Sequence, residues 1–552
     1  MSQDSTRSPL LAVCLIAAGF LAAYHPALDA ELDVRDDHEI IRFVSDELIH
    51  PSLSEGFGPI RSVWEISVDR DLGQGRFRPA YYFLRFFQVE LWGIDSRSWH
   101  ATRLFIGIAT CVFLCLAGRA AGLGWIESLL LAAWSAFQAG SGEIWFRIGP
   151  SEPYAVLFLA ISLFGLAKAA RSGGAGPWDW IAVAAMALMG ASKENFVPVI
   201  PVLLVLRVGL QCGFDVKSAI PAIRSAWKPL LLGAAVFTAE FALVLSLYAR
   251  GGYGQGVANQ VANPFSPAAW GSLLWAVRAR FAYYVPVLGA ILAVGHDRFR
   301  GRKGNPVSLV LLMLGLAVAI PQLFLLRPEW LGTRYFYPAA VALAAISAVA
   351  VQRTRTVKAL WLLVVTACIA LLIPPALGVF ASAQQFSAQT QALKRMTDTV
   401  IEQSDPDKAV VLYAHPIWRW EATVGVAHLL GVRGSSSPIY IHFTGDLEKQ
   451  MGLAAAFLRG QFPGRLDTTS VSEENLEELR GSAGEPLGKA LALDNVGSII
   501  LLESDQVFAA NPPPWFDPER ARLVTIQEPA YYQRGFRVAL DSPKQAWVQI
   551  IE

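Results

Sequence analysis

The chain has 552 residues, of which 54% are hydrophobic and only 16% are charged, with a mean hydropathy of +0.40. Soluble domains carry about 25% charged residues, so the charged fraction is low for an ordinary soluble protein. The high apolar content excludes a disordered chain. The net charge of +1 gives no basic excess that would indicate a nucleic-acid partner. The five cysteines lack metal-ligand spacing, and residues 381–552 contain none, so a disulfide framework is not available there.

Apolar runs long enough to cross a bilayer recur through the first 380 residues, which indicates a polytopic α-helical membrane protein. We expect about eleven membrane-spanning helices, with approximate limits 8–28, 100–119, 124–140, 151–170, 178–192, 195–211, 229–249, 278–296, 306–326, 334–352 and 358–380. The first run could be read as a cleaved signal peptide, because small residues follow at 27–30. Its length and the single upstream basic residue, Arg7, favour a retained anchor instead.

The charges of the short loops set the orientation of these helices. One set of loops is basic, at 168–174, 297–304 and 352–358, together with the stretch from Arg207 to Lys228. The positive-inside rule places this set in the cytoplasm. The N-terminus is then cytoplasmic, and with eleven spans the C-terminus lies outside. The long first loop, 29–99, and everything after about residue 380 share that outer side.

The segment 381–552 is predicted to be a soluble α/β domain on the outer face, separate from a transmembrane domain at 1–380. Three β-like runs lie at 408–415, 437–443 and 496–503, and residues 473–493 contain helix-like stretches. The chain shows no convincing internal repeat, so the inverted-repeat architecture of many transporters receives no support.

The first outer loop opens with "ELDVRDDHEI" at 31–40, which places several acids where a membrane helix emerges. If residues 33–39 are helical, Asp33, Asp36 and Asp37 fall on neighbouring positions of one face. Close carboxylates shift each other's pKa, so one of them can serve as a base near neutral pH. The alternative is a simple helix start, in which Asp33 caps and the acids favour the positive end of the helix dipole.

Later in the same loop, "GQGRFRPAYYFLRFF" at 73–87 places Arg76, Arg78 and Arg85 among aromatic residues. We expect an amphipathic helix that lies along the interface, with its tyrosines at headgroup depth. Plain surface anchoring is the alternative.

The predicted short outer loops each retain basic and acidic residues, although the positive-inside rule predicts few basic ones there. The residues of interest are Glu143, Arg147, Glu152, Lys193, Glu194, Arg278, Arg280, Arg327, Glu329, Arg334 and Tyr335. Snorkelling anchors explain some of them, but converging basic groups beside carboxylates suit an anionic phosphate ligand. Glu240, near the middle of the seventh span, is either a functional intramembrane carboxylate or one member of a buried pair.

The ordered set of outer motifs resembles the GT-C membrane glycosyltransferases, most closely the protein O-mannosyltransferases and the lipid A aminoarabinose transferase. It consists of the paired acids of the first loop, "RFRPAYY" at 76–82, "SKEN" at 192–195 and "RYFYP" at 334–338. The resemblance covers roughly residues 8 to 380. It implies a polyprenyl-phosphate sugar donor and a site on the outer face. The family's paired acid falls on Asp36 and Asp37, where several relatives have Asp-Glu, and its phosphate-contacting basic residues fall on Lys193 and Arg334.

These observations predict a multi-pass glycosyltransferase of the bacterial inner membrane that moves a sugar from a polyprenyl-phosphate donor to a cell-envelope acceptor. Asp36 and Asp37 are the expected catalytic pair. The expected substrate-binding residues are Asp33, Arg76, Arg78, Glu143, Arg147, Lys193, Glu194, Arg280, Arg334 and Tyr335. The carboxylates of Asp36, Asp37 and Glu143 could also hold a divalent cation.

Three other functions remain open. A transporter or flippase of an anionic lipid-linked sugar would need ionisable residues deep in several spans, and apart from Glu240 the spans are poor in them. A non-catalytic membrane scaffold with a dead transferase site is the second alternative. Within the enzyme class, an oligosaccharyltransferase or ligase that moves a whole glycan is the third.

The predicted topology can be tested with reporter fusions at residue 355 and at the C-terminus. We expect the fusion at residue 355 to report the cytoplasm and the C-terminal fusion to report the outer side, because the basic loops lie inside. Both reporters on the same side of the membrane would contradict the eleven-span arrangement.

Overall fold

The computed structural model describes most of the helical part and the strands of the C-terminal part. The described residues are 8–33, 37, 40–41, 76–137, 141–213, 216–250, 337–355, 357–414, 420–437, 439–443, 496–501, 521–525 and 545–550. The predicted spans at 278–296 and 306–326 lie outside these residues.

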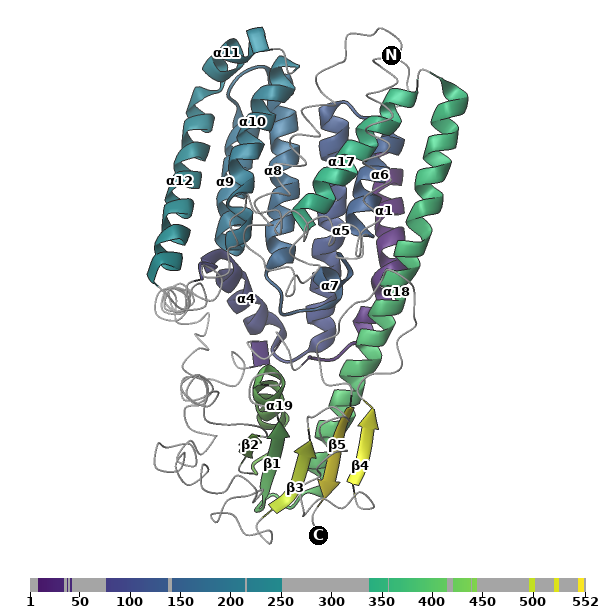
Figure 1. Cartoon of the computed structure of the whole chain (residues 1–552), viewed down its shortest axis with the longest axis vertical. Coiled ribbons are helices and arrows are strands. Elements are labelled where there is room, and N and C mark those ends of the chain that lie inside the picture. Colours follow the sequence, from purple (N-terminus) through teal and green to yellow (C-terminus); the bar gives the residue numbers. More distant parts are fainter. Residues whose placement is uncertain are drawn as a thin grey trace, which may run out of the picture.

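An elongated helical bundle forms the upper two thirds of the molecule in Figure 1, and a small sheet lies below it. The helices of the bundle are α1 (Ser8–Tyr24), α5 (Ser96–Ala121), α6 (Trp125–Ala136), α8 (Glu152–Ser172), α9 (Pro177–Ser192), α10 (Val199–Cys212), α12 (Trp227–Arg250), α17 (Tyr337–Thr354) and α18 (Lys358–Gln403). Shorter helices lie at its two ends: η1 (His25–Asp29), α4 (Pro79–Trp92), α7 (Ser141–Phe146), η4 (Glu194–Phe196) and α11 (Val216–Ser225).

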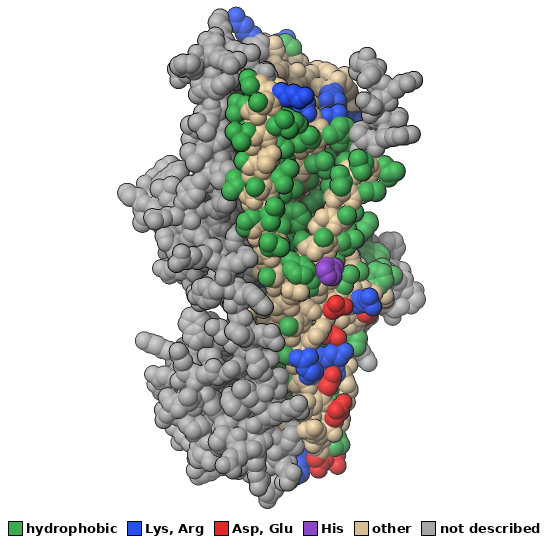
Figure 2. Space-filling view, turned by 90° about the vertical axis from the view of Figure 1, so that its right-hand side faces the viewer, with side chains coloured by type: hydrophobic (Ala, Val, Ile, Leu, Met, Phe, Trp, Pro, Cys, Tyr) green, Lys and Arg blue, Asp and Glu red, His purple; other side chains and the backbone are tan. Residues whose placement is uncertain are grey.

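In the described part of the chain, six helices are long and apolar enough to cross a membrane: Pro9–Asp29, Ser96–Ala121, Glu152–Ser172, Glu194–Cys212, Trp227–Ser246 and Lys358–Gln403. Each lies on a predicted span. Two further predicted spans fall on the shorter apolar helices α6 and α17, and another falls on α9. Figure 2 shows one side of the bundle, where the described surface carries many hydrophobic side chains, with Lys and Arg at the end away from the sheet. At the sheet-side end, acidic and basic side chains are mixed.

Helix α18 is a single 46-residue helix that leaves the bundle and reaches the sheet. At about 1.5 Å per residue it is far longer than the roughly 30 Å hydrocarbon core of a bilayer. Its last part is polar but keeps an apolar stripe, with Phe386, Leu393, Met396 and Val400 buried at helical spacing. The predicted domain boundary at residue 380 therefore lies inside one continuous helix.

The three β-like runs of the sequence are strands in the structure, and they pair with two later strands. The sheet contains β1 (Ala409–Ala414), β2 (Ile439–Phe443), β3 (Val496–Leu501), β4 (Ala521–Thr525) and β5 (Gln545–Ile550), in the order β2-β1-β3-β5-β4. Strands β2 and β3 are parallel to β1, whereas β5 is antiparallel to both β3 and β4. Helix α19 (Trp420–Val432) connects β1 to β2, as a parallel pair requires.

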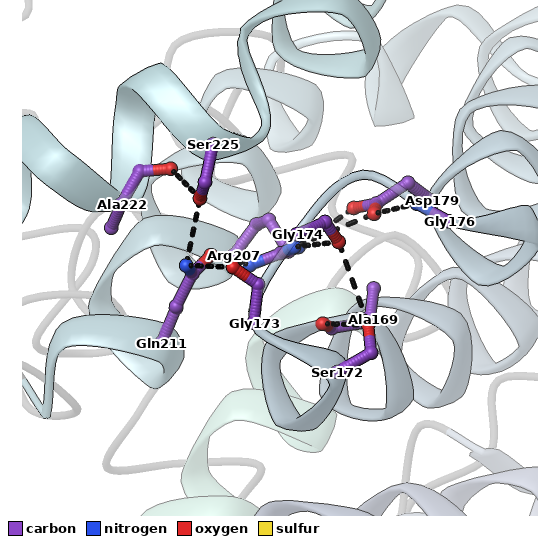
Figure 3. Close-up of polar contacts among 10 residues, drawn as sticks. All are labelled: Ala169, Ser172, Gly173, Gly174, Gly176, Asp179, Arg207, Gln211, Ala222 and Ser225. Atoms are coloured by element: carbon purple, nitrogen blue, oxygen red, sulfur yellow. Dashed lines mark hydrogen bonds and ion pairs between the residues drawn. The ribbon is translucent and has the colours of Figure 1, made fainter.

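Arg207, which was counted with the basic loops, is not a loop residue. It lies buried in α10, and its Nε donates to Asp179 Oδ1 of α9 at 2.7 Å (Figure 3). A paired charge contributes no net charge to the loop, so the basic character of this stretch rests on the residues that follow Arg207.

Close packing of α1 against α5 depends on a missing side chain. A Cβ atom at Gly107 of α5 would overlap the ring of Phe20, which is itself packed between Tyr24 and Trp145. We expect Gly107→Ala to lower the free energy of unfolding by about 1–3 kcal/mol, the usual cost of overpacking a core.

The matched control is Gly19→Ala in α1, where an added Cβ meets no atom within 4 Å. Thermal unfolding of both variants in the same detergent measures the difference. Equal melting temperatures for the two variants would show that α1 and α5 adjust freely.

Candidate active site

The loop between α7 and α8, residues 147–150, is the centre of a buried polar network at the sheet-side end of the bundle. Gly149 N donates to Asp37 Oδ1 at 2.7 Å, and the Gly149 carbonyl accepts from the Tyr81 hydroxyl at 2.8 Å. Arg147 lies between two carboxylates, with Nη2 at 3.5 Å from Asp33 Oδ2 and Nη1 at 3.3 Å from Glu143 Oε1. The loop therefore joins the start of the first outer loop to α4 and α7.

Asp37 is buried, and its carboxylate binds the backbone of two separate segments. Its Oδ2 accepts from Asp33 N at 2.9 Å while its Oδ1 accepts from Gly149 N. Its carbonyl accepts from the backbone N–H groups of Ile40 and Ile41, so one turn follows it. Charged hydrogen bonds of this kind are stronger than neutral ones, and Asp37 therefore fastens the acidic stretch to the 147–150 loop.

Two buried guanidinium groups converge on the same loop. Arg85 of α4 and Arg103 of α5 both donate from Nη2 to the Ile148 carbonyl, and Arg103 Nη2 lies 3.2 Å from the Pro150 carbonyl. Aromatic faces surround them, with the Arg85 Cζ 5.0 Å from the Tyr81 ring centre and the Arg103 Cζ 5.1 Å from that of Tyr154. Such contacts stabilise a desolvated cation.

Arg85 stays charged although it is buried. Burial lowers its pKa, but Tyr154, Tyr81 and the Asp37 carboxylate outweigh that effect, so the pKa of Arg85 is raised above its ordinary value. The site thus combines fixed positive charge with buried carboxylates in one water-poor region, where electrostatic interactions are strongest.

A second acid–base pair lies beside the end of α9. Lys193 Nζ lies 3.5 Å from Glu152 Oε1 at the start of α8, and both side chains are nearly buried. Asn195 follows in η4 with 5% of its surface exposed, and neither polar atom of its side chain has a partner among the described residues. Glu194 Oε2 is also buried and has no hydrogen-bond partner among the described residues. Buried unpaired amides are costly, so Asn195 is a candidate for ligand contact.

The structure brings several of the predicted site residues together and leaves others undescribed. Asp33, Asp37, Glu143 and Arg147 form one network, and Lys193 pairs with Glu152. Arg78 precedes α4 and donates to the Tyr82 hydroxyl at 2.7 Å, whereas Arg76 is only partly buried. Asp36, Arg280, Arg334 and Tyr335 lie outside the described residues.

The tyrosines of α4 face the protein, and their depth in a membrane stays a prediction. Tyr81, Tyr82 and Arg85 are buried against the bundle, while Phe83 and Phe87 on the opposite side are exposed. The inward face of the helix includes the guanidinium of Arg85 and the tyrosine hydroxyls beside Phe86 and Val89. The hydroxyl of Tyr81 therefore binds the 147–150 loop and not the bilayer surface.

Within the described residues, no group of three or more His, Cys, Asp or Glu side chains has the geometry to hold a metal ion. Glu143 contacts Arg147, and both Asp37 oxygens accept backbone N–H groups. Asp36, the third carboxylate considered for a cation, lies outside these residues.

Glu240 lies apart from this network, on α12. Its carboxylate occupies the space left by the missing side chain of Gly190 on α9, and Oε2 has no hydrogen-bond partner within the described part of the chain. The alternative of a buried pair is therefore not seen for this oxygen.

Glu31 connects the site region to the long helix and the sheet. Its Oε1 lies 2.8 Å from Lys394 Nζ of α18, and its Oε2 accepts from Ser96 Oγ at 3.0 Å. Arg433, after α19, reaches both Glu31 and Asp398. The first outer loop therefore begins at a junction between α5, α18 and the segment that follows α19.

No protein-family model and no curated protein matches this chain. Solved structures similar to it include ArnT from Cupriavidus metallidurans in the apo state, at 12% identity, with 97% of each chain covered and a TM-score of 0.49. The same ArnT bound to undecaprenyl phosphate is 13% identical over 97% of each chain, with a TM-score of 0.43. The apo Archaeoglobus fulgidus oligosaccharyltransferase is 12% identical and covers 91% of this chain and 70% of its own, with a TM-score of 0.48.

Both proteins are GT-C members, the group that the sequence motifs resemble. Similarities at this level assign no activity to the chain. The activity has to be inferred from the residues of the site.

The coupling between the arginines and Asp37 can be measured with a double-mutant cycle. We expect Arg103→Lys and Asp37→Asn each to lower thermal stability, and the double variant to lose less than the sum. Both changes loosen the same loop, and groups that share a network typically couple by about 0.5–3 kcal/mol.

The control cycle pairs Asp37→Asn with Arg97→Lys, which is exposed on the same helix as Arg103. That pair should be additive. Additivity in the Arg103 cycle as well would mean that Arg103 does not position Asp37.

Proposed function

We propose that the protein is a membrane glycosyltransferase that moves a sugar from a polyprenyl-phosphate donor to a cell-envelope acceptor on the outer side of the membrane. One observation carries this proposal. Buried carboxylates and buried guanidinium groups from the first outer loop, α4, α5 and the 147–150 loop meet at the sheet-side end of the bundle. This is where the headgroup of a lipid-linked substrate lies when its chain is in the bilayer.

Transfer from a lipid phosphate has three chemical requirements. The acceptor hydroxyl has to lose its proton to a base, the departing phosphate has to be stabilised by fixed positive charge, and water has to be kept away. Asp33, Asp37 and Arg147 are almost completely buried. Burying charged groups to this extent costs free energy unless they pair. Its presence at one end of the bundle is what a site of this chemistry requires.

Asp36 is the proposed base, and Asp37 the residue that orients it. Both oxygens of Asp37 accept backbone N–H groups, from Asp33 and Gly149. Adjacent residues on one turn point in different directions, so we assign the two acids different roles. This arrangement supports a division of roles between the two acids.

The phosphate of the donor is proposed to contact basic residues of several outer segments. Lys193 is already placed beside Glu152, and Asn195 presents an amide from the following turn. Arg334, with Tyr335 and Arg280, is proposed to complete the positive side of the site, because a guanidinium binds phosphate oxygens in a bidentate manner. Arg76, Arg78 and Glu194 are proposed as further contacts to the donor headgroup or the acceptor.

The proposal includes a topology. The protein lies in the inner membrane with a cytoplasmic N-terminus, and the residues that follow the last span form an extracytoplasmic α/β domain. The mixed acidic and basic surface at the sheet-side end of the bundle, opposite an end rich in Lys and Arg, supports this orientation.

A deletion strain complemented with variants tests the base whichever sugar is transferred. We expect Asp36→Asn to abolish one envelope glycan in mass spectra and to leave its lipid-linked precursor accumulated, because a positioned base supplies about a hundred- to ten-thousand-fold in rate. Asp37→Asn should also impair transfer, through displacement of the loop.

The matched control is Asp407→Asn, an exposed acid beyond the end of α18. This variant should restore the glycan fully. A wild-type glycan level with Asp36→Asn, at equal protein abundance in the membrane, would remove Asp36 from the mechanism and leave Asp33 or Glu143 as the next candidate.

A further inference from the structure

Helix α11 lies at the opposite end of the bundle from the site and has two distinct outward faces. Ile220 and Ile223, three residues apart, are 60% and 46% exposed, while Ala222 is buried against the bundle. Lys217 and Arg224, seven residues apart, share a second face. A short helix with an apolar face beside a basic face is the pattern of a segment that lies in a membrane interface.

The apolar face continues without interruption into a membrane-spanning helix. Trp227, Leu231 and Leu232 at the start of α12 are exposed by 53%, 61% and 45%. Trp227–Ser246 is one of the candidate spans, and α11 directly precedes it in the chain. A helix in this position borders the interface at which its span enters the membrane.

The basic face continues in the same way. Arg224 and Lys228 are exposed, and Lys228 Nζ lies 5.7 Å from the ring centre of Trp227. Two described acids at this end of the bundle are already engaged, Asp179 by Arg207 and Glu127 by Arg355. A positive surface beside the apolar face is complementary to anionic headgroups.

A set of polar contacts fixes the rotation of α11 about its own axis (Figure 3). Gln211 Nε2 donates to Ser225 Oγ and to the Gly173 carbonyl, both at 2.8 Å, and Arg207 Nη1 donates to Gln211 Oε1 at 2.6 Å. Ala175 N donates to the Ser225 carbonyl at 3.0 Å. The end of α11 is thus fastened through Gln211 and Arg207 to the loop between α8 and α9, so its outward faces are held in one orientation before any lipid binds.

We propose that α11 is an interfacial helix that binds anionic phospholipid headgroups through Arg224 and Lys228, with Lys217 beside them, while Ile220, Ile223 and Trp227 insert among the acyl chains. The proposed partner is the lipid of the leaflet at this end of the bundle. This site is separate from the proposed transferase site and stands on different residues.

Hydrogen–deuterium exchange of the full-length protein in nanodiscs tests the proposal. The discs contain either phosphatidylcholine alone or phosphatidylcholine with 30% phosphatidylglycerol, chosen as roughly the anionic content that makes surface charge effective. We expect peptides that cover 216–228 to exchange more slowly in the anionic discs, by roughly fivefold for each basic residue engaged. Arg224→Gln with Lys228→Gln should abolish that difference between the two disc types.

The matched control, Lys168→Gln with Lys358→Gln, removes the same charge from α8 and α18 at the same end of the bundle. It should keep the lipid dependence. Ile220→Ser with Ile223→Ser should raise exchange in both types of disc, since the apolar anchor is lost. Equal exchange of the wild type in the two disc types, or lipid dependence that survives in the Arg224 and Lys228 variant, would overturn the proposal.

Discussion

The Ile148 carbonyl accepts hydrogen bonds from two buried guanidinium groups, and the sheet-side end of the bundle depends on this contact. Two cations so close together repel each other in a medium of low polarity, unless carboxylates lie nearby. Asp37, bound to the next residue of the same loop, supplies such a charge. The arginines, the acid and the loop therefore form one unit, in which each member lowers the free-energy cost of burying the others.

Much of the helical architecture could be predicted because a bilayer imposes a simple rule of length and polarity on each span. The side of α4 that faces the protein could not be predicted from the sequence. In a soluble helix the polar side faces water, whereas Tyr81 and Arg85 turn towards the protein and Phe83 and Phe87 face outward. The pattern of polar and aromatic residues is the same in both cases, so periodicity alone does not tell which side is buried.

The site was predictable as a set of acids and bases but not as a set of contacts. The bond from Gly149 to Asp37 joins residues 112 positions apart and uses a backbone N–H, which no side-chain motif reveals. Arg103 lies in an apolar span with no acid near it in sequence, and Arg207 finds its partner 28 positions away. Asn195 follows the predicted Lys193 and Glu194 in the chain, and it drew attention only because both polar atoms of its buried side chain lack a partner among the described residues.

Helix α18 has a mechanical consequence. One helix joins the bundle to the sheet, and two prolines, Pro374 and Pro375, lie inside it. Because a proline removes a backbone N–H, the helix bends most easily at this point. Lys394 of the same helix forms an ion pair with Glu31, at the start of the acidic stretch. A bend of α18 at these prolines therefore changes the position of Lys394, and with it the ion pair to Glu31.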